Sequence, residues 1–163
     1  MRKLIPLLLA AVAAAHGSTL LTVNFSIPTL SGNPGDLLQF SGSLTNNSGS
    51  EVFINSDSFT FAISGALDDS PFLTNAPISL PAFGSSGPFA FLQVLIPLGQ
   101  SGGTYGGTFD VLGGATDTQQ DVVGSAAFNV TVNGANPSVP EPQSLILMAA
   151  GVAVLALRRR LAS

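Results

Sequence analysis

The chain has 163 residues, enough for one domain, and nine acidic against five basic residues give it a formal net charge of −4. All five Lys and Arg residues lie at the two ends, so residues 17–140 carry only negative charge, which excludes nucleic acid as a partner. The absence of Cys excludes disulfides, thiolate metal sites and cysteine nucleophiles.

The N-terminus has the layout of a secretory signal peptide. A short basic start precedes an apolar stretch over residues 4–15, and small residues follow for cleavage, at Ala13, Ala15 and Gly17. We therefore predict a signal peptide over residues 1–17 and export of the rest of the chain. The alternative is an uncleaved membrane anchor, which the shortness of the apolar run disfavours.

Residues 18–134 are predicted to form one β-domain. Apolar and polar residues alternate with period two in several stretches, which Gly-, Pro- and Asn-rich breakers separate. The predicted strands lie at residues 19–26, 38–44, 59–63, 89–96, 105–111 and 122–132. Short strands at such spacing are typical of an all-β, antiparallel Ig-like β-sandwich. No stretch before Gln143 predicts a helix.

Two details of the strand arrangement follow from the pattern. The run at residues 89–96 is apolar on both faces, which predicts a central strand of a sheet. The turn-forming residues 46–49 precede the apolar residues 52–54, which predicts a β-hairpin.

The β-domain lacks the usual catalytic groups. Its stretch contains no Lys, and the only His, His16, lies in the signal peptide, so neither a Ser-His-Asp arrangement nor a phosphate-binding loop with Lys is available. Paired carboxylates remain, if Asp68 and Asp69 face Asp57 or Asp117. The chain has no Trp and a single Tyr to stack against sugars. We expect no enzyme activity and no cofactor.

Calcium is the more reasonable use of these acids, since Ca²⁺ prefers oxygen ligands. Asp57 with Asn55 and the pair Asp68 and Asp69 are weak candidate loops. Their spacing matches no calcium-binding motif, so solubilising loop charge is favoured and we predict no metal site.

A Pro-rich segment follows the β-domain and ends in a Pro-x-Pro tripeptide, in which a proline stands on each side of one residue. Its distinctive residues are Val139, Pro140, Glu141, Pro142 and Ser144. Each proline fixes its own φ and keeps the residue before it out of the helical region, so Val139 and Glu141 are held extended, as a protease groove requires. The alternative is a stiff linker that stops the following helix from extending toward the β-domain.

The last part of the chain predicts a transmembrane helix over residues 143–160, within a C-terminal segment of residues 135–163 whose linker spans 135–142. The uncharged run 145–157 would make about 20 Å of helix against a bilayer core of about 30 Å. Extension through Ser144 and snorkelling of Arg158, Arg159 and Arg160 make up the difference. These arginines act as a cytoplasmic stop. A buried or interfacial helix is the alternative.

The tripeptide, the apolar run and the terminal arginines together resemble the PEP-CTERM sorting signal, which occurs on exported proteins of Gram-negative bacteria that make extracellular polysaccharide. The resemblance implies recognition and processing by exosortase, a membrane protease-transpeptidase. It also implies anchorage in the inner membrane with a periplasmic body, followed by delivery to the cell surface or the extracellular space. Extracellular polysaccharide is a further expected partner.

The resulting prediction is a non-enzymatic surface or extracellular-matrix protein that exosortase sorts at its C-terminal motif. A glycan- or protein-binding module of the cell envelope is the first alternative. A membrane-anchored periplasmic domain without processing is the second.

Overall fold

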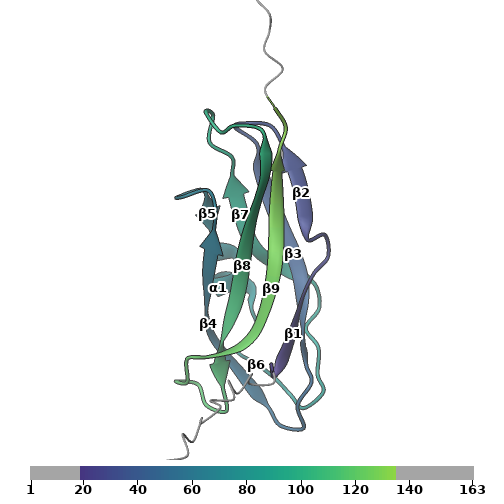
Figure 1. The fold of residues 1–163 in the computed structure, drawn as a ribbon. Coiled ribbons are helices and arrows are strands. Elements are labelled where there is room, and N and C mark those ends of the chain that lie inside the picture. Colours follow the sequence, from purple (N-terminus) through teal and green to yellow (C-terminus); the bar gives the residue numbers. More distant parts are fainter. Residues whose placement is uncertain (1–18, 135–163) are drawn as a thin grey trace, which may run out of the picture. The chain divides into compact units, whose positions relative to one another are not determined.

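A computed structural model describes residues 19–134, which form nine strands and one short helix (Figure 1). In chain order the elements are β1 (Leu21–Phe25), β2 (Thr29–Gly32), β3 (Leu37–Asn46), β4 (Val52–Phe61), β5 (Leu67–Asp68), α1 (Ser70–Asn75), β6 (Ser79–Leu80), β7 (Phe89–Leu95), β8 (Gly103–Gly114) and β9 (Asp121–Val132). The all-β prediction is confirmed for this part of the chain.

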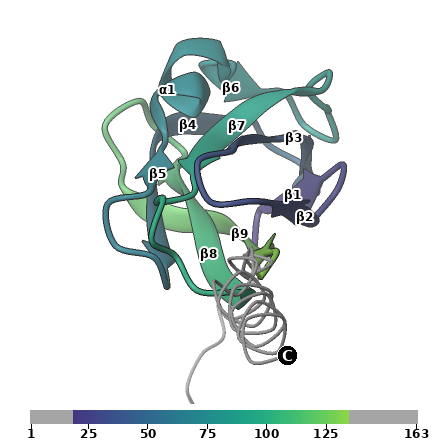
Figure 2. The ribbon, with the colours of Figure 1, turned by 90° about the horizontal axis from the view of Figure 1, so that it is seen from above.

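The strands form two sheets that pack face to face as a sandwich (Figures 1 and 2). One sheet has the order β1-β3-β7-β5 and is antiparallel throughout. The other has the order β2-β9-β8-β4-β6 and is antiparallel except where β2 lies parallel to β9. Strand β7 lies between β3 and β5, so the predicted internal position of residues 89–96 is confirmed.

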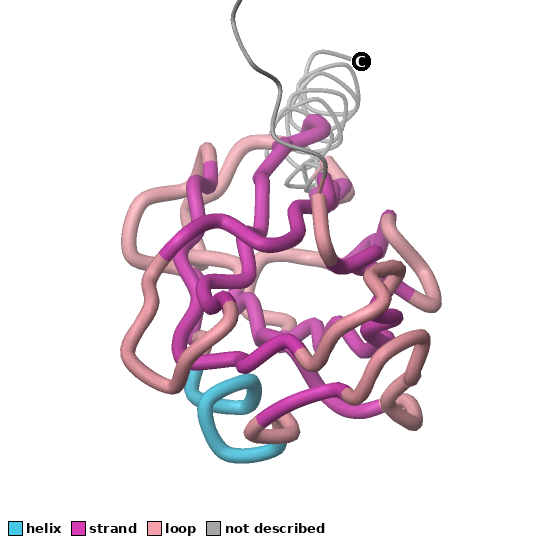
Figure 3. The backbone as a smooth tube through the Cα atoms, turned by 90° about the horizontal axis from the view of Figure 1, so that it is seen from below, coloured by secondary structure: helices cyan, strands magenta, loops and turns pink. Residues whose placement is uncertain are grey.

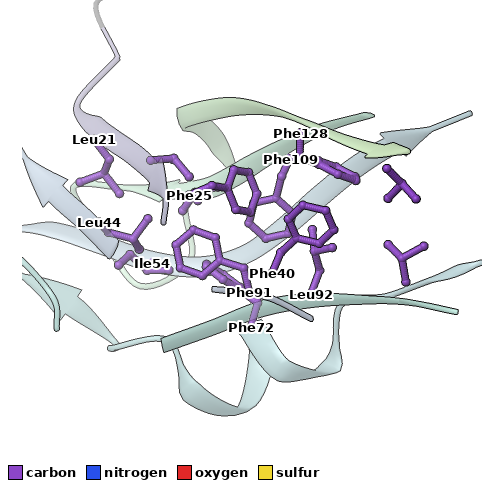
Figure 4. Close-up of a cluster of buried hydrophobic side chains, with 14 of the residues drawn as sticks. Leu21, Phe25, Phe40, Leu44, Ile54, Phe72, Phe91, Leu92, Phe109 and Phe128 are labelled. Carbon is purple, nitrogen blue, oxygen red and sulfur yellow. The ribbon is translucent and has the colours of Figure 1, made fainter. Parts of the chain in front are cut away.

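The core between the sheets is built from phenylalanine. Phe25 of β1 lies at its centre, and its ring centroid is 5.3 Å from that of Phe91 and 5.8 Å from that of Phe40 (Figure 4). The five largest of the fully buried side chains are all phenylalanine, namely Phe40, Phe72, Phe91, Phe109 and Phe128. Edge-to-face pairs of this kind add about 0.5–1.5 kcal/mol each beyond their burial. A chain without disulfides is thus stabilised by one continuous aromatic core.

The sequence prediction that no helix precedes Gln143 is wrong for residues 70–75. Helix α1 contains Pro71 in its first turn, where a proline needs no hydrogen-bond donor and its fixed φ suits a helix. The helix lies at the outside of the sandwich (Figure 3) and buries Phe72, whose ring centroid is 5.1 Å from that of Phe109. Burial of that one ring stabilises a helix too short to form on its own.

The predicted hairpin after residue 46 is also wrong, because β3 and β4 belong to different sheets. The connection crosses from one sheet to the other around Asn46, which is 1% exposed. The Asn46 side-chain amide donates to the carbonyl oxygens of Ser50, Leu80 and Pro81 at 2.7, 3.1 and 3.0 Å. Its Oδ1 accepts the backbone N–H of Ser48 at 2.9 Å. Residues 46–49, whose sequence is typical of a hairpin turn, therefore form part of a connection between the two sheets.

The predicted signal peptide (1–17) and the predicted sorting segment (135–163) lie outside the described residues. Between residues 19 and 134, no helix has the length and apolar character needed to cross a membrane.

Candidate functional site

The structure brings two of the candidate aspartates together. Asp57 lies on β4 opposite Val111 of β8, and Asp69 stands directly before α1. Both carboxyl oxygens of Asp57 are buried and have no hydrogen-bond partner among the described residues. The sequence left open whether Asp68 and Asp69 face Asp57 or Asp117. In the structure Asp69 faces Asp57, whereas Asp117 lies in the loop between β8 and β9.

The surroundings of Asp57 favour its neutral form. Burial of the carboxyl, followed by the negative charge of Asp69, raises the pKa of Asp57 to about 7. Since the stretch from residue 19 to residue 134 contains no Lys, Arg or His, no cation there offsets either effect. Near neutral pH the Asp57 carboxyl therefore exchanges a proton with solvent, and its charge changes with small changes in pH.

The other candidate ligands for calcium point elsewhere. Hydrogen bonds from the side chain and backbone of Ser70 lower the pKa of Asp68, and the backbone bond measures 3.0 Å. Asn55 donates to the carbonyl oxygens of Thr116 and Gln119 at 2.9 and 2.7 Å.

Asn55 and Asp57 also lie within strand β4, not in the loop that the sequence predicted. In the described part of the chain, no three His, Asp or Glu residues gather where they could hold a metal ion.

A cavity of about 140 Å³ opens beside α1, with Phe72, Ile54 and Ile78 among its lining residues. Its lining contains no charged side chain. Asp57 is not among the residues that line this cavity.

The described body ends where the sorting segment begins. Strand β9 finishes at Val132, and the Asn133 backbone N–H donates to the carbonyl oxygen of Gly32 at 2.8 Å. The Asn133 side-chain amide donates to Asn33 Oδ1 at 3.2 Å. The chain therefore leaves the sandwich fastened to the turn between β2 and β3.

The fold and the C-terminal residues together define a β-sandwich protein with a C-terminal signal. Residues 138–160 match the family model of the PEP-CTERM protein-sorting motif. The matched segment contains the sequence-predicted sorting residues, from Val139 to Ser144, and the three terminal arginines. The chain thus carries a PEP-CTERM protein-sorting motif, which supports exosortase-dependent sorting of an exported protein.

The chain is similar to a number of solved structures, including the following three. The ASH/PapD-like domain of human CEP192 has a TM-score of 0.40 and 13% identity, covering 80% of this chain and 97% of that one. The CARDB domain of a Pyrococcus furiosus protein has a TM-score of 0.42 and 22% identity, covering 69% and 94%. A family 123 glycoside hydrolase from Clostridium perfringens has a TM-score of 0.37 and 13% identity, covering 76% of this chain but 29% of the hydrolase. No curated protein matches the chain.

Proposed function

We propose that this chain is an exported, non-enzymatic protein of the cell surface or extracellular matrix, which exosortase processes at its C-terminal motif. The match of residues 138–160 to the PEP-CTERM protein-sorting motif carries the proposal. The signal-peptide layout of residues 1–17 supports it, because a sorting signal of this kind acts on an exported chain.

The two ends of the chain have complementary tasks in this proposal. The signal peptide takes the body into the periplasm, and the helix at 143–160 holds it in the inner membrane, with Arg158, Arg159 and Arg160 on the cytoplasmic side. Pro140 and Pro142 keep the segment between body and membrane extended, with Glu141 as its one charged handle. Cleavage there frees the body for the cell surface or the extracellular space.

The strand order supports an Ig-like assignment of the body. The order β1-β3-β7-β5 corresponds to the A-B-E-D sheet of immunoglobulin domains, and β9-β8-β4 corresponds to the G-F-C sheet. A fold of this kind serves structural and binding roles equally, so a glycan- or protein-binding module remains the second candidate for the body.

The small number of side chains in the body that could act as nucleophile, acid or base supports a non-enzymatic role. Residues 19–134 contain no His, Lys, Arg or Cys, and the carboxyl of Asp57 on β4 is paired with that of Asp69, directly before α1. A screen of the released body on glycan arrays distinguishes the two candidates: saturable glycan binding favours the binding module.

The processing step is tested by intact-mass analysis and fractionation of the protein from its native host. We expect the released wild-type protein to lack residues 145–163. The double variant Pro140→Ala/Pro142→Ala should stay membrane-bound at full length, because Val139 and Glu141 are no longer held extended. Pro137→Ala is the matched control, since it alters a proline outside the tripeptide, and it should be processed normally. Release of wild-type protein that still carries residues 145–163 contradicts the proposal.

A further inference from the structure

One end of the sandwich carries a cluster of exposed leucines. Leu98 is 85% exposed, Leu37 is 59% exposed and Leu95 is 55% exposed. Leu37 and Leu95 are direct partners across β3 and β7, and Leu98 follows in the loop after β7. Single exposed leucines are ordinary on protein surfaces, but a contiguous group of them marks a contact surface. We call these three residues the leucine patch.

Two residues of the leucine patch, Leu95 and Leu98, line a hollow of about 430 Å³ together with Gly35, Gly65, Ala66, Ile96 and Pro97. Backbone hydrogen bonds hold the surrounding loops together. The Gly35 N–H donates to the carbonyl oxygen of Ile96 at 2.8 Å, and the Leu95 N–H donates to that of Ala66 at 2.9 Å. The patch is therefore a preformed apolar surface, built by the loops that follow β2, β4 and β7.

The leucine patch lies at the end of the body from which the sorting segment departs. Strand β9 ends at Val132 beside the end of β2, at the same end of the sandwich as the loop after β7 (Figure 1). Gly103, which closes that loop, is the register partner of Val132. The linker 135–142 can extend at most about 28 Å, so an anchored chain keeps the patch close to the membrane.

Charge is also unevenly placed along the body. Of its eight acidic residues, Asp36 alone belongs to the loops that carry the leucine patch. The Asp36 carboxylate accepts the backbone N–H of Asn33 at 2.7 Å and its side-chain amide at 3.3 Å. Glu51, Asp117 and Asp121 lie in or beside the connections at the opposite end. The end near the linker is thus the least anionic part of the body.

We infer that the leucine patch docks on the surface of the lipid bilayer that holds the C-terminal helix. The inference rests on the proposed function, because it needs the helix as an anchor. A short tether turns docking into an intramolecular step, so even a small apolar surface is occupied. Lipid is favoured over a charged partner because the loops that carry the patch contain a single acidic residue, Asp36. Since residues 19–134 have no cation to attract anionic headgroups, the contact with a zwitterionic bilayer is apolar and insensitive to salt.

Docking has a consequence for release. The helix is the strong membrane attachment, and the leucine patch is a weak one, because a small apolar surface binds a bilayer only reversibly. Cleavage near Pro140 removes the helix and leaves the patch alone, which holds the body only reversibly. The patch thus orients the body before processing without retaining it afterwards.

The test uses the full chain reconstituted in phosphatidylcholine vesicles. Since the chain has no Cys, Leu98→Cys provides one site for an environment-sensitive fluorophore. The matched control is Phe83→Cys, because Phe83 is 73% exposed and lies beside the β3–β4 connection at the opposite end. We expect quenching by spin-labelled lipid at position 98 but not at position 83, unchanged by salt. Equal quenching at the two positions, or none at position 98, overturns the inference.

A second copy of the chain is the main competing occupant. A fluorescence change at position 98 that depends on the protein-to-lipid ratio but is not quenched by spin-labelled lipid identifies self-association, and it overturns lipid docking. Flotation of the wild-type protein with vesicles tests the anchor independently. If the chain does not float, the proposed anchor fails. If it floats while position 98 stays unquenched, only the docking inference fails.

A second variant measures the contribution of one leucine. With the fluorophore at Gly99→Cys, where a new side chain meets nothing within 4 Å, Leu98→Ser should lower the docked-to-undocked ratio about tenfold. Leu73→Ser is the control, since Leu73 is 59% exposed but lies on α1. An unchanged ratio for Leu98→Ser, or an equal loss for Leu73→Ser, contradicts lipid docking.

Discussion

Asp57 is the residue whose environment departs most from that of an ordinary aspartate. The folded chain binds its proton more tightly than the unfolded chain, because the pKa is raised from 3.8 to about 7. The associated stability is fully present below the unfolded pKa and is lost as pH rises through about 7. Asp69 is the charged group that faces it from the α1 side, and its β8 partner is the uncharged Val111. The body should therefore be more stable at pH 5 than at pH 8.

Asp57→Asn tests this pH dependence. The amide carries no charge at any of these pH values, so the variant should gain stability at pH 8 relative to the wild type. The expected gain is on the order of 1 kcal/mol after discounting for solvent screening, or a few degrees in melting temperature. Thermal unfolding from pH 5 to pH 8 measures it, with Asp117→Asn in the exposed loop as control. A wild-type melting temperature that rises over this range refutes the assignment.

Helix α1 is the element that the sequence pattern missed, because six residues are too few to display a helical period. Pro71 after Asp69 and Ser70 was the available signal for a helix start. What holds the helix in place is one side chain, Phe72, which is 1% exposed.

Phe72→Ala should therefore destabilise the body by about 3–5 kcal/mol, since it leaves a cavity among Phe89, Phe91 and Phe109. Denaturant unfolding measures the loss. The neighbouring Leu73→Ala should cost far less, because that side chain is exposed. Similar losses for the two variants would show that α1 is not held by its buried ring.

Strand β9 shows where period-two reasoning holds and where it fails. Phe128, Val130 and Val132 are buried as the alternation predicts. Strict alternation back from Phe128 would also bury Val122, but Val122 is 56% exposed, whereas Val123 is 2% exposed. A register shift between Val111 and Leu112 adds one residue to β9 and reverses the alternation beyond it. A bulge is a property of two paired strands, so one strand's sequence does not reveal it.

For the whole molecule, composition and alternation were enough to predict an all-β sandwich, and the C-terminal residues were enough to predict the sorting motif. The assignment of strands to sheets was not predictable, because turn residues do not tell whether a chain returns to its own sheet. In this chain the Asn46 side-chain amide holds the crossing between the sheets in place, through hydrogen bonds to the carbonyl oxygens of Leu80 and Pro81. The strand assignment also determines which carboxyls meet, so the sequence alone left both Asp57 and Asp117 as partners for Asp68 and Asp69.

The purely negative body also predicts a response to salt. Residues 19–134 carry eight acidic side chains and no Lys, Arg or His, so their charges repel one another in the folded state. Added NaCl screens this repulsion, with a Debye length of about 30 Å at 0.01 M and about 8 Å at 0.15 M. The melting temperature should rise by a few degrees between these concentrations. A fall would indicate attractive surface charges that this composition does not supply.

The parallel pairing of β2 with β9 has a mechanical consequence. Its four register pairs, from Thr29 with Asn129 to Gly32 with Val132, join the first and last parts of the sandwich. A pull on the two ends of the body draws β2 and β9 in opposite directions along their common axis. The hydrogen bonds of the pair then share the load in shear, and none opens before the others. In the role proposed for it at a cell surface, the body would in this way be protected against being drawn out strand by strand.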